Sequence, residues 1–136
     1  MIALDSSFLI AFKVKNDVNH GRADSLMRQV VSGSFGNPFI TNYIFDETVT
    51  GIFVRSKNLK LAVEYGSELL ASLEIFDVSE ETFREAWKIF SEQKDTELSF
   101  TDSTTIATMN NHGAKRIATF DGGFGDIKDI NPVGIV

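Results

Sequence analysis

Residues 2–9 read Ile2-Ala3-Leu4-Asp5-Ser6-Ser7-Phe8-Leu9, so that a short apolar run is followed by a carboxylate and then by two serines. An apolar run of this length is too short for a helix, and it predicts a buried strand that ends at Asp5. The two serines then open a helix whose apolar side continues through Phe8 and Leu9. The expected order is therefore strand, carboxylate, helix.

The same alternation of short apolar runs and longer stretches of helical period continues along the chain. This alternation predicts an α/β fold with a central, mostly parallel β-sheet flanked by helices. About five strands are expected, at residues 2–4, 39–40, 74–78, 116–120 and 133–136. No repeat, linker or biased segment divides the chain. We therefore expect one domain that covers residues 1–136.

Three of the predicted helices have residues that can cap their first turn. Thr41 or Asn42 can cap the helix that contains Glu47. Ser79 can cap the helix that follows it, in which we expect a core-facing stripe of Phe83, Ala86, Trp87 and Phe90. Thr101 can cap a last helix, which would then begin at Asp102.

The composition excludes several classes of protein. The 136 residues include no cysteine, so the chain can form no disulfide framework, zinc ribbon or iron–sulfur site. The N-terminal residues do not resemble a secretory signal, and no apolar run approaches the roughly 18 residues that span a bilayer. A cytoplasmic protein without membrane contact is therefore expected. The 19 acidic and 13 basic residues give a net charge of −6, which argues against binding of nucleic acid by bulk electrostatics alone.

Four carboxylates stand where predicted elements begin or end. Asp5 and Asp121 each follow a strand, Asp102 opens a helix, and Glu47 lies in the second turn of a helix that follows a strand. In an open parallel sheet, ligands bind beyond the carboxyl ends of the strands, so all four side chains can converge on one crevice. Four such charges would repel one another, and a divalent cation that prefers oxygen ligands, Mg²⁺ or Mn²⁺, removes the conflict. Such a site can activate water and stabilise a phosphoryl transition state.

Each of these carboxylates also has a purely structural interpretation. Asp5 can cap the helix that starts at Ser6, and Asp102 can interact with the dipole of its own helix. Asp121, which precedes two glycines, fits ordinary turn chemistry. Glu47 has no local structural role, although a solvated border position is open to it. The residues alone leave both interpretations open.

Four stretches with these acids occur in a characteristic order: residues 2–9, Ile40-Thr41-Asn42-Tyr43-Ile44-Phe45-Asp46-Glu47, Leu98-Ser99-Phe100-Thr101-Asp102-Ser103 and Ile117-Ala118-Thr119-Phe120-Asp121-Gly122-Gly123-Phe124. Together with the spacing between them they span nearly the whole chain. In these stretches the sequence resembles a PIN domain, and specifically the small VapC-type toxins of toxin–antitoxin pairs. One stretch alone would be a weak signal, whereas four in order are specific.

The resemblance implies a ribonuclease site at the carboxyl edge of a central parallel sheet. Asp5, Glu47 and Asp102 match the three acids that bind the metal directly or through water, and Asp121 matches the fourth acid. Ser6 matches a hydroxyl residue that hydrogen-bonds within the site. The implied reaction is hydrolysis of an RNA phosphodiester by a water that Mg²⁺ or Mn²⁺ activates. The resemblance also implies a homodimer and capture by a small antitoxin protein.

The leading interpretation, an endoribonuclease toxin, has three competitors. The first is a PIN nuclease with a housekeeping role in RNA processing, and the second is a catalytically silent PIN-like binding module. The third treats Asp5 as a phospho-acceptor, but phosphatase-like folds of that kind usually carry a second Asp two residues on, where this chain has Ser7. The net charge does not exclude a nuclease, because with four acids assigned to the crevice the other 15 nearly balance the 13 bases.

Overall fold

A computed structural model describes residues 1–135 of the chain, and the predicted α/β fold is confirmed. Five short strands form one sheet: β1 (Ile2–Leu4), β2 (Pro38–Thr41), β3 (Glu74–Phe76), β4 (Arg116–Ala118) and β5 (Asn131–Val133). The helices are α1 (Ser6–Lys13), α2 (His20–Val31), α3 (Asn42–Ser56), α4 (Leu59–Ser72), α5 (Glu80–Ser91), α6 (Phe100–His112) and the 3₁₀ turn η1 (Gly122–Phe124). No helix among these residues is long and apolar enough to cross a membrane.

The sheet is entirely parallel, in the order β3-β2-β1-β4-β5. The chain builds outward from β1 to β2 and β3, and then returns to the opposite side of β1 to form β4 and β5. The third strand is shorter than the predicted 74–78, since pairing with β2 ends at Phe76. The last strand lies earlier than the predicted 133–136, because Asn131–Val133 is the segment that pairs with β4. Val136 lies outside the described residues.

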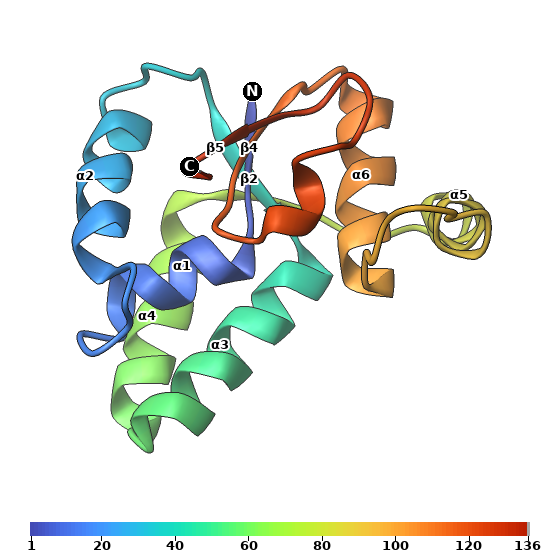
Figure 1. Ribbon diagram of the computed structural model, residues 1–136. Coiled ribbons are helices and arrows are strands. Elements are labelled where there is room, and N and C mark those ends of the chain that lie inside the picture. Colours follow the sequence, from blue (N-terminus) through green and yellow to red (C-terminus); the bar gives the residue numbers. More distant parts are fainter. Residues whose placement is uncertain (136) are drawn as a thin grey trace.

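Helices cover both faces of this sheet. Helices α1 to α4 lie on one side, and α6 with α5 outside it lies on the other (Figure 1). Successive residues of β1 point to opposite faces, as a strand requires: Ile2 and Leu4 belong to the core under α1 to α4, whereas Ala3 belongs to the core under α6. The central strand is therefore buried on both faces, which is typical of parallel sheets.

Two helix starts matter for the position of the acidic residues. The hydroxyl of Thr41 accepts a hydrogen bond from the amide of Ile44 at 3.1 Å, so Thr41, and not the alternative Asn42, caps α3. The prediction that Thr101 caps the last helix is wrong, because α6 begins at Phe100 and its cap is Ser99. Asp102 is consequently the third residue of α6 rather than the first, which is the position that can bond back to the cap.

The predicted core stripe of α5 is only partly right. Ala86 is fully buried, but Phe83 and Trp87 are 45% and 58% exposed. The reason is that α5 packs mainly on α6 and stands outside the main layers, as Figure 1 shows. Phe83 and Trp87 instead lie near the ring of Phe100, with centroids 5.0 Å and 6.5 Å away. The apolar residues that recur with helical period in α5 therefore include exposed aromatic rings as well as the buried Ala86.

Candidate functional site

The carboxyl edge of the sheet has its switch point between β1 and β4, where the chain changes from one side of β1 to the other. This is the position at which ligands bind in open α/β sheets. Asp5 follows β1 directly, and its amide donates to the carbonyl of Ala118, the last residue of β4, at 2.9 Å. The strand pair therefore brings the segments that carry Asp5 and Asp121 together.

Asp5 is almost completely buried, with 3% of its surface exposed. The hydroxyls of Ser7 and Thr119 both donate to its Oδ2, at 2.6 Å and 2.8 Å. Its side chain makes no capping hydrogen bond to α1, so the capping interpretation fails for this residue. Burial raises the pKa of Asp5, against the opposing effect of the two hydroxyls, and the nearby charge of Asp121 raises this pKa further.

Glu47 lies in the second turn of α3 and reaches the same region. The hydroxyl of Ser6 donates to its Oε2 at 2.8 Å, which links α1 to α3. Burial raises the pKa of Glu47, although the bond from Ser6 opposes this, and the charges of Asp5, Asp46 and Asp121 add to the increase. Glu47 is nevertheless exposed, so it lies at the solvated border of an acidic group that it forms with Asp5, Asp102 and Asp121.

Asp102 has a structural role and also lies in the acidic group. Its Oδ2 accepts the amide of Ser99 at 2.9 Å, while the hydroxyl of Ser99 accepts the amide of Asp102 at 3.0 Å, so the two residues form a capping box. Burial raises the pKa of Asp102 to about 6, against the hydrogen bonds from Ser99, and the charges of Asp5 and Asp121 contribute to the increase. A residue that only capped its helix would have its charge stabilised, not disfavoured.

Asp121, like Glu47, is exposed. It precedes η1, and its Oδ1 accepts the amide of Gly123 at 2.8 Å, which is the turn chemistry expected from the two glycines. Its charge nevertheless raises the pKa of Asp5, of Glu47 and of Asp102. The four acids, spread from residue 5 to residue 121, therefore act on one another at one end of the sheet.

The structure brings these carboxylates into one electrostatic group, but not into a closed metal cage. Within residues 1–135, no three side chains of the metal-binding types lie close enough together to hold an ion ready-made. The donors still fit a hard divalent cation, because they are all carboxylate oxygens. Asp5 and Asp102 are buried and their pKa values are raised, so their negative charges are disfavoured in the folded chain, and a cation would offset those charges.

Two residues near the group were missed by the sequence analysis. Ser7 and Thr119 bond Asp5 from both strand ends, yet no role was predicted for either residue. The sequence does offer one signal for such a role, which is a hydroxyl residue directly after a buried strand and close to a predicted site carboxylate. Thr119 stands there after β4, and it is fully buried.

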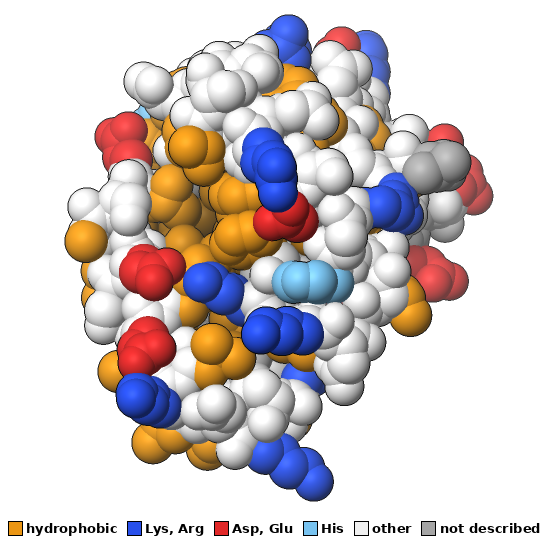
Figure 2. Space-filling view, turned by 90° about the vertical axis from the view of Figure 1, so that its left-hand side faces the viewer, with side chains coloured by type: hydrophobic (Ala, Val, Ile, Leu, Met, Phe, Trp, Pro, Cys, Tyr) orange, Lys and Arg blue, Asp and Glu red, His pale blue; other side chains and the backbone are white. Residues whose placement is uncertain are grey.

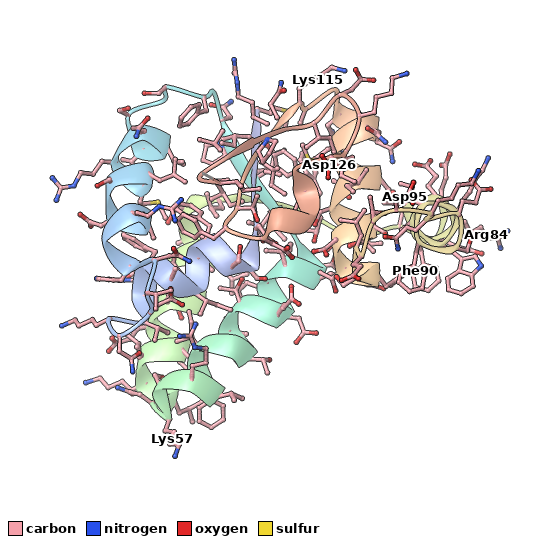
Figure 3. The ribbon with its side chains drawn as sticks, in the orientation of Figure 1. Lys57, Arg84, Phe90, Asp95, Lys115 and Asp126 are labelled. Carbon is pink, nitrogen blue, oxygen red and sulfur yellow. The ribbon has the colours of Figure 1, made fainter. Side chains whose placement is uncertain are left out.

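The basic side chains labelled in Figure 3 lie away from this edge of the sheet. Lys57 is at the tip of the α3–α4 hairpin, and Arg84 is on the outer side of α5. Arg84 is also paired with Glu80 of the same helix, with an N–O distance of 2.6 Å. Neither residue contributes positive charge to the acidic group.

Comparison with protein families identifies the fold. A model of the PIN domain matches residues 2–130, which is nearly the whole chain. The chain belongs to the PIN-domain family. No curated protein sequence matches it significantly.

Solved structures agree with this assignment. VapC20 of Mycobacterium tuberculosis, described as a Sarcin-Ricin loop cleaving toxin, is similar with a TM-score of 0.81 and 26% identity over 92% of this chain and 93% of that chain. VapBC2 of Rickettsia felis, bound to a DNA fragment from its promoter, gives a TM-score of 0.71 and 18% identity over 98% of both chains. FitAcB of Neisseria gonorrhoeae gives 0.68 and 18% identity over 97% of this chain and 96% of that chain. This PIN domain is therefore of the VapC type, and the family match together with VapC20 indicates a nuclease of the toxin–antitoxin kind.

Proposed function

We propose that this PIN domain is an endoribonuclease that depends on Mg²⁺ or Mn²⁺ and serves as the toxin of a VapBC-type pair. One observation carries the proposal: four carboxylates from distant parts of the chain act on one another at the carboxyl edge of the sheet. The likeness to VapC20, which is described as a Sarcin-Ricin loop cleaving toxin, supports RNA as the proposed substrate. Hydrolysis by water would leave a 5′-phosphate and a 3′-hydroxyl.

When bound, a divalent cation supplies an activated water and offsets charge in the phosphoryl transition state. Asp5 and Asp102 would hold the cation with their carboxylate oxygens, and Asp121 would add an oxygen from the exposed turn before η1. Glu47, oriented by the hydroxyl of Ser6, would help to hold the cation or its water. The residues of this chain thus bind and orient, and no histidine is needed as a base.

We also propose that a small antitoxin captures this chain and that two copies associate. Apolar side chains gather in a hollow between α2 and α4, on the face seen in Figure 2. Val31 lines this hollow and is 78% exposed, and Leu70, which lines a separate groove between α3 and α4, is 62% exposed. Exposed aliphatic groups of this size are common where proteins meet. Phe83 and Trp87 form a second exposed apolar surface on α5, which suits a subunit interface.

The competing functions predict different contacts and products. A phospho-acceptor at Asp5 would usually need a second Asp two residues on, where this chain has Ser7, whose hydroxyl donates to Oδ2 of Asp5. A silent binding module has no reason to keep Asp5 and Asp102 buried with raised pKa values, because charges in such positions destabilise the fold. A housekeeping nuclease would share the site, and co-purification of a small partner protein would favour the toxin over it.

Cleavage of RNA by the purified protein tests the proposal. We expect cleavage in Mg²⁺ or Mn²⁺, and loss of cleavage in chelator and in Asp102→Asn, which keeps a side-chain oxygen that can accept the amide of Ser99. Asp95→Asn is the matched control, since this exposed residue lies in the loop between α5 and α6. Cleavage that persists in chelator or in Asp102→Asn would refute the proposal.

A further inference from the structure

The side-chain hydrogen bonds to Asp5 involve only one of its two carboxylate oxygens. Both hydroxyl donors, Ser7 at 2.6 Å and Thr119 at 2.8 Å, bond the same atom, Oδ2. No side chain of the described residues donates to Oδ1. The backbone of Ser6 also hydrogen-bonds this carboxylate and lowers its pKa. Two side chains therefore hold Oδ2, and no side chain holds Oδ1.

Backbone amides hold the two hydroxyls beside Asp5. Each accepts a backbone amide from the segment after β4: the amide of Phe120 donates to Ser7 Oγ at 3.0 Å, and the amide of Asp121 donates to Thr119 Oγ1 at 2.9 Å. Each has only one proton, and Oδ2 is the nearer acceptor for both, because the two hydroxyl oxygens lie 3.2 Å from each other. Two neighbouring amides, two hydroxyls and one carboxylate oxygen thus form connected chains of hydrogen bonds, which polarise one another.

This arrangement has a consequence for the kind of cation that the acidic group can bind. Ca²⁺ takes about six to eight oxygens and often uses both oxygens of one carboxylate, whereas Mg²⁺ requires near-octahedral geometry and keeps several waters. With Oδ2 committed to hydroxyl donors, Asp5 can offer only Oδ1. A site built on such a ligand suits the smaller cation.

We propose that Ser7 and Thr119 are positioning residues of the metal site, which hold Oδ2 of Asp5 and thereby make the site selective for Mg²⁺ or Mn²⁺ over Ca²⁺. The proposal rests on the proposed function, because it presupposes that the acidic group binds a cation. It adds two residues and a selectivity that follow from the geometry around Asp5. The two residues act through Asp5 and need not touch the cation.

Direct binding of Mn²⁺ and Ca²⁺ to the metal-free protein tests this proposal without any measurement of activity. The loss of the Mn²⁺ electron paramagnetic resonance signal reports binding, and competition by Ca²⁺ gives the ratio of the two affinities. Thr119→Val keeps the shape of the side chain and removes one donor. We expect its Mn²⁺ affinity to fall about 10- to 100-fold, as is typical when a residue that orients a metal ligand is lost, and its Ca²⁺ affinity to fall less.

Three further variants complete the test. Thr119→Ser restores the hydroxyl and should restore the wild-type ratio, whereas Ser7→Ala should lower the ratio as Thr119→Val does. Thr108→Val is the matched control, because the hydroxyl of Thr108 is as deeply buried but bonds only Thr104 of its own helix, at 2.8 Å. It should leave both affinities unchanged.

The outcomes separate the two proposals. If the wild-type protein binds no Mn²⁺, the proposed metal site and this inference both fail. If the wild type binds Mn²⁺ but Thr119→Val and Ser7→Ala keep its Mn²⁺-to-Ca²⁺ ratio, only the inference fails, even when both affinities fall equally. Should Thr119→Val not fold, as judged by circular dichroism, the half-buried position of Ser7 lets Ser7→Ala decide in the same way.

Discussion

Removing one charge from the acidic group should stabilise the metal-free protein. Asp102 is 8% exposed, and its pKa is raised from 3.8 to about 6, so its ionised form is disfavoured in the folded chain. A pKa change of this size corresponds to about 3 kcal/mol at neutral pH. Partial contact with water reduces this figure, and Asp102→Asn also gives up a favourable charge near the helix start worth about 0.3–1 kcal/mol. The expected net gain in unfolding free energy is about 1–2 kcal/mol, or about 4–8 °C in Tm.

The gain should depend on pH in a defined direction. Because the folded-state pKa of Asp102 is raised, the folded chain binds this proton more tightly than the unfolded chain, and stability falls as pH rises from 3.8 to about 6. Above that window the penalty is complete, and below it Asp102 is protonated in both states. The advantage of Asp102→Asn should therefore be full at pH 7.5 and should disappear near pH 4.

Urea denaturation in chelator at the two pH values measures this effect. Asp95→Asn, which removes an exposed charge, should change stability by less than about 0.5 kcal/mol at either pH. If Asp102→Asn proves equal to the wild type or less stable at pH 7.5, the reasoning is wrong, and Asp102 is only a helix cap.

Two further predictions concern the same end of the sheet. Mg²⁺ or Mn²⁺ at 100 times its dissociation constant should stabilise the wild type by about 2.7 kcal/mol, which is measured as a higher Tm. The same cation should stabilise Asp102→Asn far less. Equal increases in Tm in both proteins would mean that the cation binds elsewhere. Ser99→Ala removes the hydroxyl that accepts the amide of Asp102 at 3.0 Å, and it should lower the unfolding free energy by about 1 kcal/mol in urea denaturation. An unchanged stability would mean that the capping box contributes nothing.

Much of the fold could be predicted because the signals are local. Strand β1 is a short apolar run that ends at a carboxylate, and α3 carries its cap at Thr41 where the sequence offers one. The start of α6 was misassigned because Ser99 and Thr101 are both good caps, and sequence alone does not say which hydroxyl meets a free amide. The exposure of Trp87 could not be predicted either, since a helical stripe shows which side is apolar but not what covers it.

The sequence predicts that the four acids lie at one edge of the sheet, but it does not predict which residues form hydrogen bonds to them. Asp5, Glu47, Asp102 and Asp121 could be grouped because parallel strands share one carboxyl edge. The bonds of Thr119 join residues 114 positions apart, and no pattern along the chain encodes the direction of a hydroxyl.

The chemical nature of the cleaved RNA ends tests the central claim most directly. The four acids are proposed to act through a cation and water, with no attack by a ribose hydroxyl. Incubation of purified protein with end-labelled RNA in Mg²⁺ should therefore give fragments with a 5′-phosphate and a 3′-hydroxyl, and none in chelator. Fragments with a 2′,3′-cyclic phosphate, or cleavage that continues in chelator, would contradict the account.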